Sequence, residues 1–170
     1  RHLVYAMEQE TRIGSATWKL LSRSSEGKID SVGLAISKAR RAFDRGARTE
    51  DDGRWDESAE IFGVSGAAAM YKRTMVENIR IFGEFFDERF FAYKEDVDVA
   101  WRAQIYGWTS CYVPQAVAYH ERGWKKGERR SRSLHIRQCS YINRYRIMLK
   151  NDTFRYILLH LPWLLPYELA

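Results

Sequence analysis

The first half of the chain alternates between apolar and polar positions in short segments. Apolar residues recur on one side of residues 1–10, which predicts an amphipathic helix. Residues 12–21 form a largely apolar run that predicts a buried strand, and residues 29–37 alternate as a short strand does. The charged stretch 38–57 contains two glycines and predicts a loop, and loops of that length are usually functional or mobile.

The second half of the chain predicts longer elements. The pattern favours two helices and then two strands, over residues 71–79, 95–106, 108–113 and 116–120. Gly107 suits the position just after a helix, where glycine adopts positive φ without strain. Pro114 stops the first of the two strands because it has no N–H to donate to a neighbouring strand.

Beyond residue 121 the composition changes. Residues 133–150 predict a basic amphipathic helix, and residues 154–169 are strongly apolar. That apolar stretch is shorter than the ~20 residues of a membrane-spanning helix, and two prolines interrupt it. We therefore predict two regions, a domain at 1–121 and a basic segment with a membrane-associating tail at 122–170. The basic residues of this second region include Arg122, Lys125, Lys126, Arg129, Arg130, Arg132 and Arg137.

Composition narrows the class of protein. The chain has 170 residues, of which 45% are hydrophobic and 14% aromatic, so one domain with a packed core is expected. The net charge of +6 favours an anionic partner such as a nucleotide, a nucleic acid or an acidic membrane surface. Two cysteines provide neither a disulfide framework nor a zinc site. The chain begins with Arg1 inside a helical pattern, and we expect it to be a fragment of a longer protein.

An acidic cluster, Glu95, Asp96 and Asp98, follows directly on an aromatic run. Three interpretations are open: a solvated helix N-terminus, a D-x-D metal site, or a general base whose proton affinity is raised by its neighbours. The aromatic residues favour a functional interpretation, since surface acids seldom follow such a run. For Asp98 we also expect a structural role, such as pairing with an arginine.

Two further positions attract a functional interpretation. His120 ends an apolar strand, where a histidine is either a satisfied core residue or a ligand for a metal or a diphosphate. Residues 63–66 read G-V-S-G, but a nucleophile elbow needs another glycine where Ala67 stands. Small residues that line a pocket are the better interpretation of this segment.

Three stretches then carry a resemblance to a known family. They are GVSGAAAMYKR at 63–73, GEFFDERFFAYKEDVDVAWR at 83–102 and GWTSCYVPQAVAYH at 107–120. Together they resemble the C-terminal half of a family 2 inverting glycosyltransferase, and the rhamnosyltransferase-like branch in particular. The run INRYR at 142–146 and the hydrophobic tail are similar to the same branch.

The resemblance implies a fold and a set of roles. The fold would be α/β, the C-terminal half of a GT-A (Rossmann-like) mixed-sheet domain with amphipathic helices at its C-terminal end. Asp96 would be the general base for the acceptor hydroxyl, and Glu95 would orient it. His120 would bind the metal. Substrate-binding positions would be Gly66, Ala67, Phe91, Tyr93 and Asp98.

Cofactor and partners also follow from the resemblance. A divalent ion, Mg²⁺ or Mn²⁺, would be held mainly by an upstream D-x-D motif that this chain lacks, and not by Asp96 and Asp98. The donor would be a nucleotide-diphosphate sugar, carrying rhamnose or another hexose. The acceptor would be a lipid-linked sugar or a glycan of bacterial cell-wall or polysaccharide synthesis, at the inner face of the cell membrane, with no nucleic acid involved. The alternative is a non-enzymatic basic module that binds nucleic acid or anionic membrane through 122–150.

Overall fold

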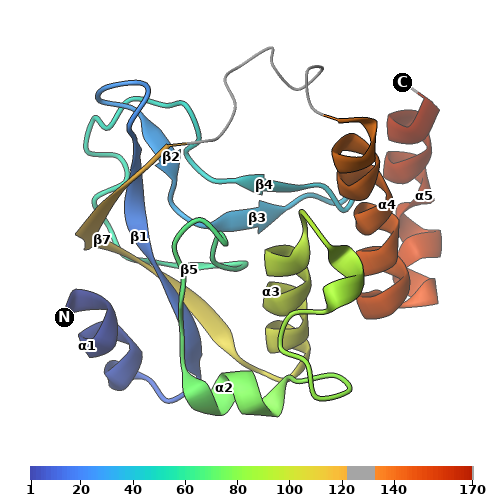
Figure 1. The fold of residues 1–170 in the computed structure, drawn as a ribbon, viewed down its shortest axis with the longest axis horizontal. Helices are drawn as coiled ribbons and strands as arrows, with labels where there is room; N and C mark the ends of the chain where they lie inside the picture. Colours follow the sequence, from blue (N-terminus) through green and yellow to red (C-terminus); the bar gives the residue numbers. More distant parts are fainter. Residues whose placement is uncertain (122–132, 170) are drawn as a thin grey trace.

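The computed structural model describes residues 1–121 and 133–169, which form a mixed α/β fold (Figure 1). Two long strands run parallel at the centre of the main sheet, and shorter antiparallel strands flank them in the order β2–β1–β7–β5, with β6 also paired to β1. A separate two-stranded sheet pairs β3 with β4. The strands are β1 Ile13–Ser22, β2 Ile29–Ser31, β3 Leu34–Ile36, β4 Ala42–Asp44, β5 Ala59–Ile61, β6 Met70–Tyr71 and β7 Thr109–His120.

The helices agree with most of the sequence-based expectations. Helices predicted at 1–10, 95–106 and 133–150 are confirmed, and the apolar tail is also helical despite its two prolines. The helical elements are α1 His2–Gln9, α2 Arg73–Asn78, the 3-10 turn η1 Glu88–Phe90, α3 Glu95–Ile105, α4 Leu134–Asn151 and α5 Phe154–Leu169. Among the described residues, no helix combines the length and the apolar composition needed to cross a membrane.

The two strands predicted on either side of Pro114 are one strand, β7, so that prediction is wrong. In the pairing of β1 with β7, Trp18 lies opposite Val113 and the next residue, Lys19, lies opposite Val117. The three residues in between, beginning with Pro114, bulge out of the ladder. A bulge accommodates proline because no partner strand needs its missing N–H.

The single strand predicted at 29–37 is also wrong, because it divides into β2 and β3. Gly33 lies between them at φ +104°, and a Cβ at this position would lie 2.4 Å from Ile61 Cδ1. Only glycine fits such a position without strain. The chain then turns back as β4, so the stretch predicted as a loop at 38–57 contains a strand.

Helix α3 is buried on two sides, and it lies between the main sheet and α4 (Figure 1). On one side Val97 and Trp101 pack with Phe90, Leu34 and Ile147 of α4. On the other side its residues join a cluster with α2. After its last turn, Gly107 adopts φ +81° and donates to Gln104 O at 2.9 Å, which confirms it as the residue that ends the helix.

Candidate active site

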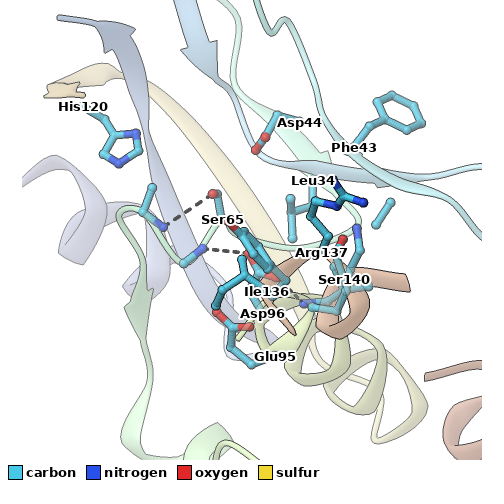
Figure 2. Close-up of a pocket in the computed structure, with 16 residues that line it drawn as sticks. Leu34, Phe43, Asp44, Ser65, Glu95, Asp96, His120, Ile136, Arg137 and Ser140 are labelled. Atoms are coloured by element: carbon cyan, nitrogen blue, oxygen red, sulfur yellow. Dashed lines mark hydrogen bonds between the residues drawn. The ribbon is translucent and has the colours of Figure 1, made fainter. Parts of the chain in front are cut away.

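A cavity of about 520 Å³ opens where loop 65–67, the start of α3, the first turns of α4, strand β4 and the end of β7 converge (Figure 2). These elements come from distant parts of the chain, so the residues that line the cavity become neighbours only when the chain folds. Its lining includes Asp44, Ser65, Gly66, Ala67, Tyr93, Lys94, Glu95, Asp96, His120, Arg137 and Ser140.

Asp96 is held in this cavity by two backbone amides. Its Oδ2 accepts a hydrogen bond from Gly66 N at 3.0 Å, and its Oδ1 accepts one from Val97 N at 2.8 Å. Burial raises the pKa of Asp96 above its ordinary value, and the two amide hydrogen bonds, which stabilise the charged form, offset part of that rise. The result is a fixed carboxylate that takes up a proton more readily than an exposed aspartate does.

Glu95 lies beside Asp96 and shares its environment. Burial raises the pKa of Glu95, and the negative charge of Asp96 raises it further. The Oε2 atom of Glu95 and the Oη atom of Tyr71 are buried and have no hydrogen-bond partner among the described residues. Burial and the charges of both acids raise the pKa of Tyr71 as well. Buried polar atoms are normally paired, so Glu95 Oε2 and Tyr71 Oη are available to form hydrogen bonds with a bound molecule near Asp96.

Asp98 does not line the cavity, so the structure does not bring it together with the other residues predicted to bind substrate. Its side chain is fully buried, and its oxygens contact Arg102 Nε and Lys150 Nζ, each at 2.9 Å, and accept from Asn151 Nδ2 at 2.8 Å. The expected pairing with an arginine is confirmed. Because Asp98 faces away, Asp96 and Asp98 do not form a paired metal site.

The two predicted aromatic residues differ in position. Tyr93 lines the cavity together with the predicted Gly66 and Ala67. Phe91 does not line it: its side chain is 74% exposed, and its ring centroid lies 5.4 Å from that of His135. An aromatic run alone does not show which of its members faces a site.

His120 lines the cavity at the end of β7, and a hydrogen bond to a buried carboxylate holds its imidazole ring. Its Nδ1 lies 2.8 Å from Oδ2 of Asp30, a buried residue of β2. An ionised carboxylate only accepts, so Nδ1 carries the hydrogen, and in the neutral ring Nε2 then keeps its lone pair. Metal-binding histidines are commonly held in this way by a carboxylate. Asp30 could not be identified from the sequence pattern, because the pairing joins residues that are 90 positions apart.

The residues described offer one element of a metal site and not a complete one. Within 1–121 and 133–169, no group of three His, Cys, Asp or Glu side chains could hold a metal ion. The imidazole of His120 fits a metal as a single ligand, given its carboxylate support. The remaining ligands of any such ion would have to come from elsewhere.

Asp44 and Arg137 add opposite charges to the cavity. Asp44 belongs to β4, within the stretch predicted as a loop, and its charge contributes to the raised pKa of Asp96. Arg137 belongs to the predicted basic segment, and its position places a cation at the cavity. The basic residues of that segment at 122–132 lie outside the described residues.

Sequence comparison indicates a glycosyltransferase-like relationship. The similar proteins are N-acetylglucosaminyl-diphospho-decaprenol L-rhamnosyltransferases of two Mycobacterium tuberculosis strains, CDC 1551 / Oshkosh and ATCC 25618 / H37Rv. Each is 38% identical over 66 residues, which are 38% of this chain and 20% of the relative. The chain thus matches about a fifth of the length of these curated relatives. No protein-family profile matches the chain, and no solved structure matches it.

Proposed function

We propose that this chain is the acceptor-side half of a family 2 inverting glycosyltransferase with a GT-A fold, in which Asp96 is the general base. One observation carries the proposal: the Asp96 carboxylate is held by Gly66 N and Val97 N in a cavity where burial raises its pKa. A general base must be fixed in position and ready to accept a proton, and this carboxylate meets both needs. The partial similarity to rhamnosyltransferases supports the reaction class.

In the proposed reaction Asp96 removes the proton of an acceptor hydroxyl while the hydroxyl oxygen attacks the anomeric carbon of the donor sugar. A new glycosidic bond forms, the bond from that carbon to the diphosphate breaks, and the electron pair leaves with the diphosphate. Attack from the face opposite the leaving group inverts the configuration. General-base catalysis of this kind contributes roughly 10²–10⁴-fold to a rate. Glu95 orients the acceptor beside the base.

The proposed substrates are a nucleotide-diphosphate sugar and a lipid-linked or glycan acceptor. Rhamnose, or another hexose, is the proposed sugar because the relatives are named as L-rhamnosyltransferases that act on N-acetylglucosaminyl-diphospho-decaprenol. Gly66 and Ala67 would separate donor from acceptor, and Tyr93 would contact the acceptor. The guanidinium of Arg137 is a suitable partner for a diphosphate.

We further propose that His120 is one ligand of a Mg²⁺ or Mn²⁺ ion whose other ligands belong to a D-x-D motif outside this chain. The hydrogen bond from its Nδ1 to Asp30 supports this, since it leaves Nε2 as the metal-binding nitrogen. When bound, such an ion would neutralise negative charge on the leaving diphosphate. The protein would work as a peripheral protein at the inner face of the cell membrane, where lipid-linked acceptors are found.

The test is Asp96→Asn in the full-length gene product, with sugar transfer and donor binding measured separately. We expect transfer to fall by about 10²–10⁴-fold, because the amide does not accept the proton, while the donor dissociation constant stays unchanged. Asp52→Asn is the matched control, since Asp52 lies on the surface, is not part of the cavity lining and pairs with its near neighbour Arg54. Transfer by Asp96→Asn at the rate of the control would rule out Asp96 as the base.

A further inference from the structure

The segment that leads into α3 has an unusual backbone. Phe91, Tyr93 and Lys94 adopt φ values of +55°, +67° and +74°, and none of them is glycine. Phe91 is the centre of a tight turn in which Ala92 N donates to Phe90 O. Side-chain-bearing residues rarely adopt positive φ, and a run of them persists only where surrounding contacts hold it.

Three contacts of this kind come from one fully buried side chain of α4, Asn143. Its Nδ2 lies 2.8 Å from Phe90 O, 2.9 Å from Ala92 O and 2.8 Å from Tyr93 O. An amide group carries two hydrogens, so one of them is shared between two of these carbonyls. One donor group therefore ties together three carbonyls of the strained segment.

The other end of the same amide is also fixed. Asn143 Oδ1 accepts a hydrogen bond from Arg146 Nη1 at 3.0 Å, and Arg146 Nη1 also donates to Arg89 O, just before the segment. Asn143 is thus held with its NH₂ group toward the segment. The run INRYR, noted in the sequence at 142–146, supplies both residues of this arrangement.

The held segment sets the start of the helix that carries the acidic pair. Lys94 O accepts the first hydrogen bond of α3, from Asp98 N at 3.0 Å. The positive φ of Lys94 therefore determines the direction in which Glu95 and Asp96 leave the segment. Tyr93 and Lys94 themselves line the cavity. A change in this backbone would move the cavity wall and both carboxylates together.

We propose that Asn143 is a positioning residue: its three hydrogen bonds to the carbonyls of residues 90–93 hold Asp96 in place from a helix that follows it in the chain. The inference rests on the proposed function only for the role of Asp96 as base. The effect on the backbone of this segment is a property of the 170-residue chain, and it can be measured without any transferase activity.

The test compares Asn143→Ala with Asn151→Ala in the 170-residue chain. Both remove an asparagine amide from α4, but Asn151 donates to the buried Asp98 and not to the segment. Hydrogen exchange reports on the amides of Phe91 and Ala92, both of which are hydrogen-bonded. We expect Asn143→Ala to speed their exchange at least tenfold relative to Asn151→Ala at equal global stability, adjusted with denaturant.

A second readout follows the carboxyl group of Asp96 by NMR titration. Asn143→Ala should move its pKa toward the ordinary value as the carboxylate becomes better solvated, whereas Asn151→Ala should not. The charged and titratable groups around Asp96 include Glu95, Lys94 and Asp44, with Arg137 and His120 in the same cavity lining, and neither variant alters any of them. Asn143→Ser keeps one hydrogen-bond donor, so its effects on amide exchange and on the Asp96 pKa should lie between those of wild type and Asn143→Ala. If the alanine variant does not fold, the serine variant is compared with Asn151→Ala instead.

Equal effects of the Asn143 and Asn151 variants on exchange and on the Asp96 titration would overturn the proposal, because a merely structural asparagine predicts that equality. If the wild-type gene product transferred no sugar while the Asn143 effects were found, the proposed function would fail and the positioning role would stand. If wild type transferred sugar and the Asn143 effects were missing, the positioning role alone would fail.

Discussion

Asp96 combines a functional advantage with a cost in stability. Its carboxylate is partly removed from water, and its hydrogen bonds from Gly66 N and Val97 N do not fully compensate, so its pKa lies above the ordinary value. For a carboxyl group whose folded-state pKa is raised, the native state binds the proton more tightly than the unfolded state does. Stability from this group is therefore highest at low pH and falls as pH rises through the unfolded and then the folded pKa.

We predict that Asp96→Asn makes the chain more stable at neutral pH. The substitution removes the charge whose burial is unfavourable, and the Asn oxygen still accepts from Gly66 N. Urea unfolding at pH 7 and at pH 3 measures the effect: the gain in the free energy of unfolding should be present at pH 7 and small at pH 3. A loss of stability at pH 7 would mean that the ionised carboxylate is favourable in the fold.

The pairing of His120 with Asp30 gives a second prediction for single residues. In the wild-type chain, ¹⁵N NMR should show His120 with its hydrogen on Nδ1, because Asp30 Oδ2 lies 2.8 Å away. Asp30→Ala should give a mixture of the two tautomers, since nothing then favours Nδ1–H. Titration with Mn²⁺ should broaden the His120 Nε2 signal less in the variant. A wild-type signal from the Nε2–H tautomer would contradict this arrangement.

Sequence reasoning identified several residues of the cavity but missed their partners. Glu95, Asp96, Gly66, Tyr93 and His120 were expected to act together, and the fold brings them to one cavity. The missed residues were Asp30, Asp44 and Tyr71. Asp30 stands in a short strand pattern, Asp44 in a predicted loop and Tyr71 at the start of a predicted helix that the structure begins only at Arg73. The importance of each arises only from tertiary contacts with distant parts of the chain. A local pattern contains no information on such contacts.

Among the elements, α3 and α4 are joined through Asp98. This carboxylate meets Arg102 on its own helix and Lys150 and Asn151 on α4, so it fastens α4 against the helix that carries Asp96. Lys150 also reaches Asp87, whose pKa is held well below its usual range by Arg89 and then by Lys150. The joint between the two helices is therefore ionic as well as apolar.

We predict that Asp98→Ala lowers the free energy of unfolding by about 3–5 kcal/mol, because it leaves buried cations without their partner. Urea unfolding of the 170-residue chain measures this. Asp52→Ala serves as the control, since Asp52 pairs with Arg54 on the surface and little change is expected. If the two variants lost the same stability, the ion pairs between α3 and α4 would not be a main source of stability.

The elements also show where pattern reasoning fails. The apolar stretch before His120 predicted two strands because a proline usually ends a ladder, but the bulge at Pro114 lets β7 continue to His120. The continuity matters because it delivers His120 to the cavity in a sheet strand. Gly33 had the opposite effect, since it divides one predicted strand into β2, which carries Asp30, and β3.

At the scale of the whole molecule, the α/β class was predictable and the sheet order was not. The pairing of β1 with β7 joins segments about 95 residues apart, and no periodicity in either strand encodes the partner. The class was expected from the resemblance at 63–73, 83–102 and 107–120, and the mixed sheet with C-terminal helices agrees with it. The GT-A assignment itself remains a proposal.

The C-terminal helix gives a prediction for the whole molecule. Helix α5 exposes large apolar side chains, namely Phe154, Leu158, Leu159, Trp163 and Leu165. With a net charge of +6, the chain should bind vesicles that contain anionic phosphatidylglycerol, in a salt-dependent manner. Flotation measures this binding, and the double substitution Leu159→Glu and Leu165→Glu should reduce it at least tenfold. Binding to generic DNA without binding to vesicles would favour the alternative of a nucleic-acid-binding module.

The most direct test of the proposed base is the titration of the Asp96 carboxyl carbon by ¹³C NMR in the 170-residue chain, with its signal assigned by loss in Asp96→Asn. We predict a midpoint clearly above the ordinary aspartate value of about 3.9, because burial disfavours the charged form. A midpoint at or below that value would show a carboxylate stabilised in its charged form, and it would contradict the role of Asp96 as a base prepared by its surroundings.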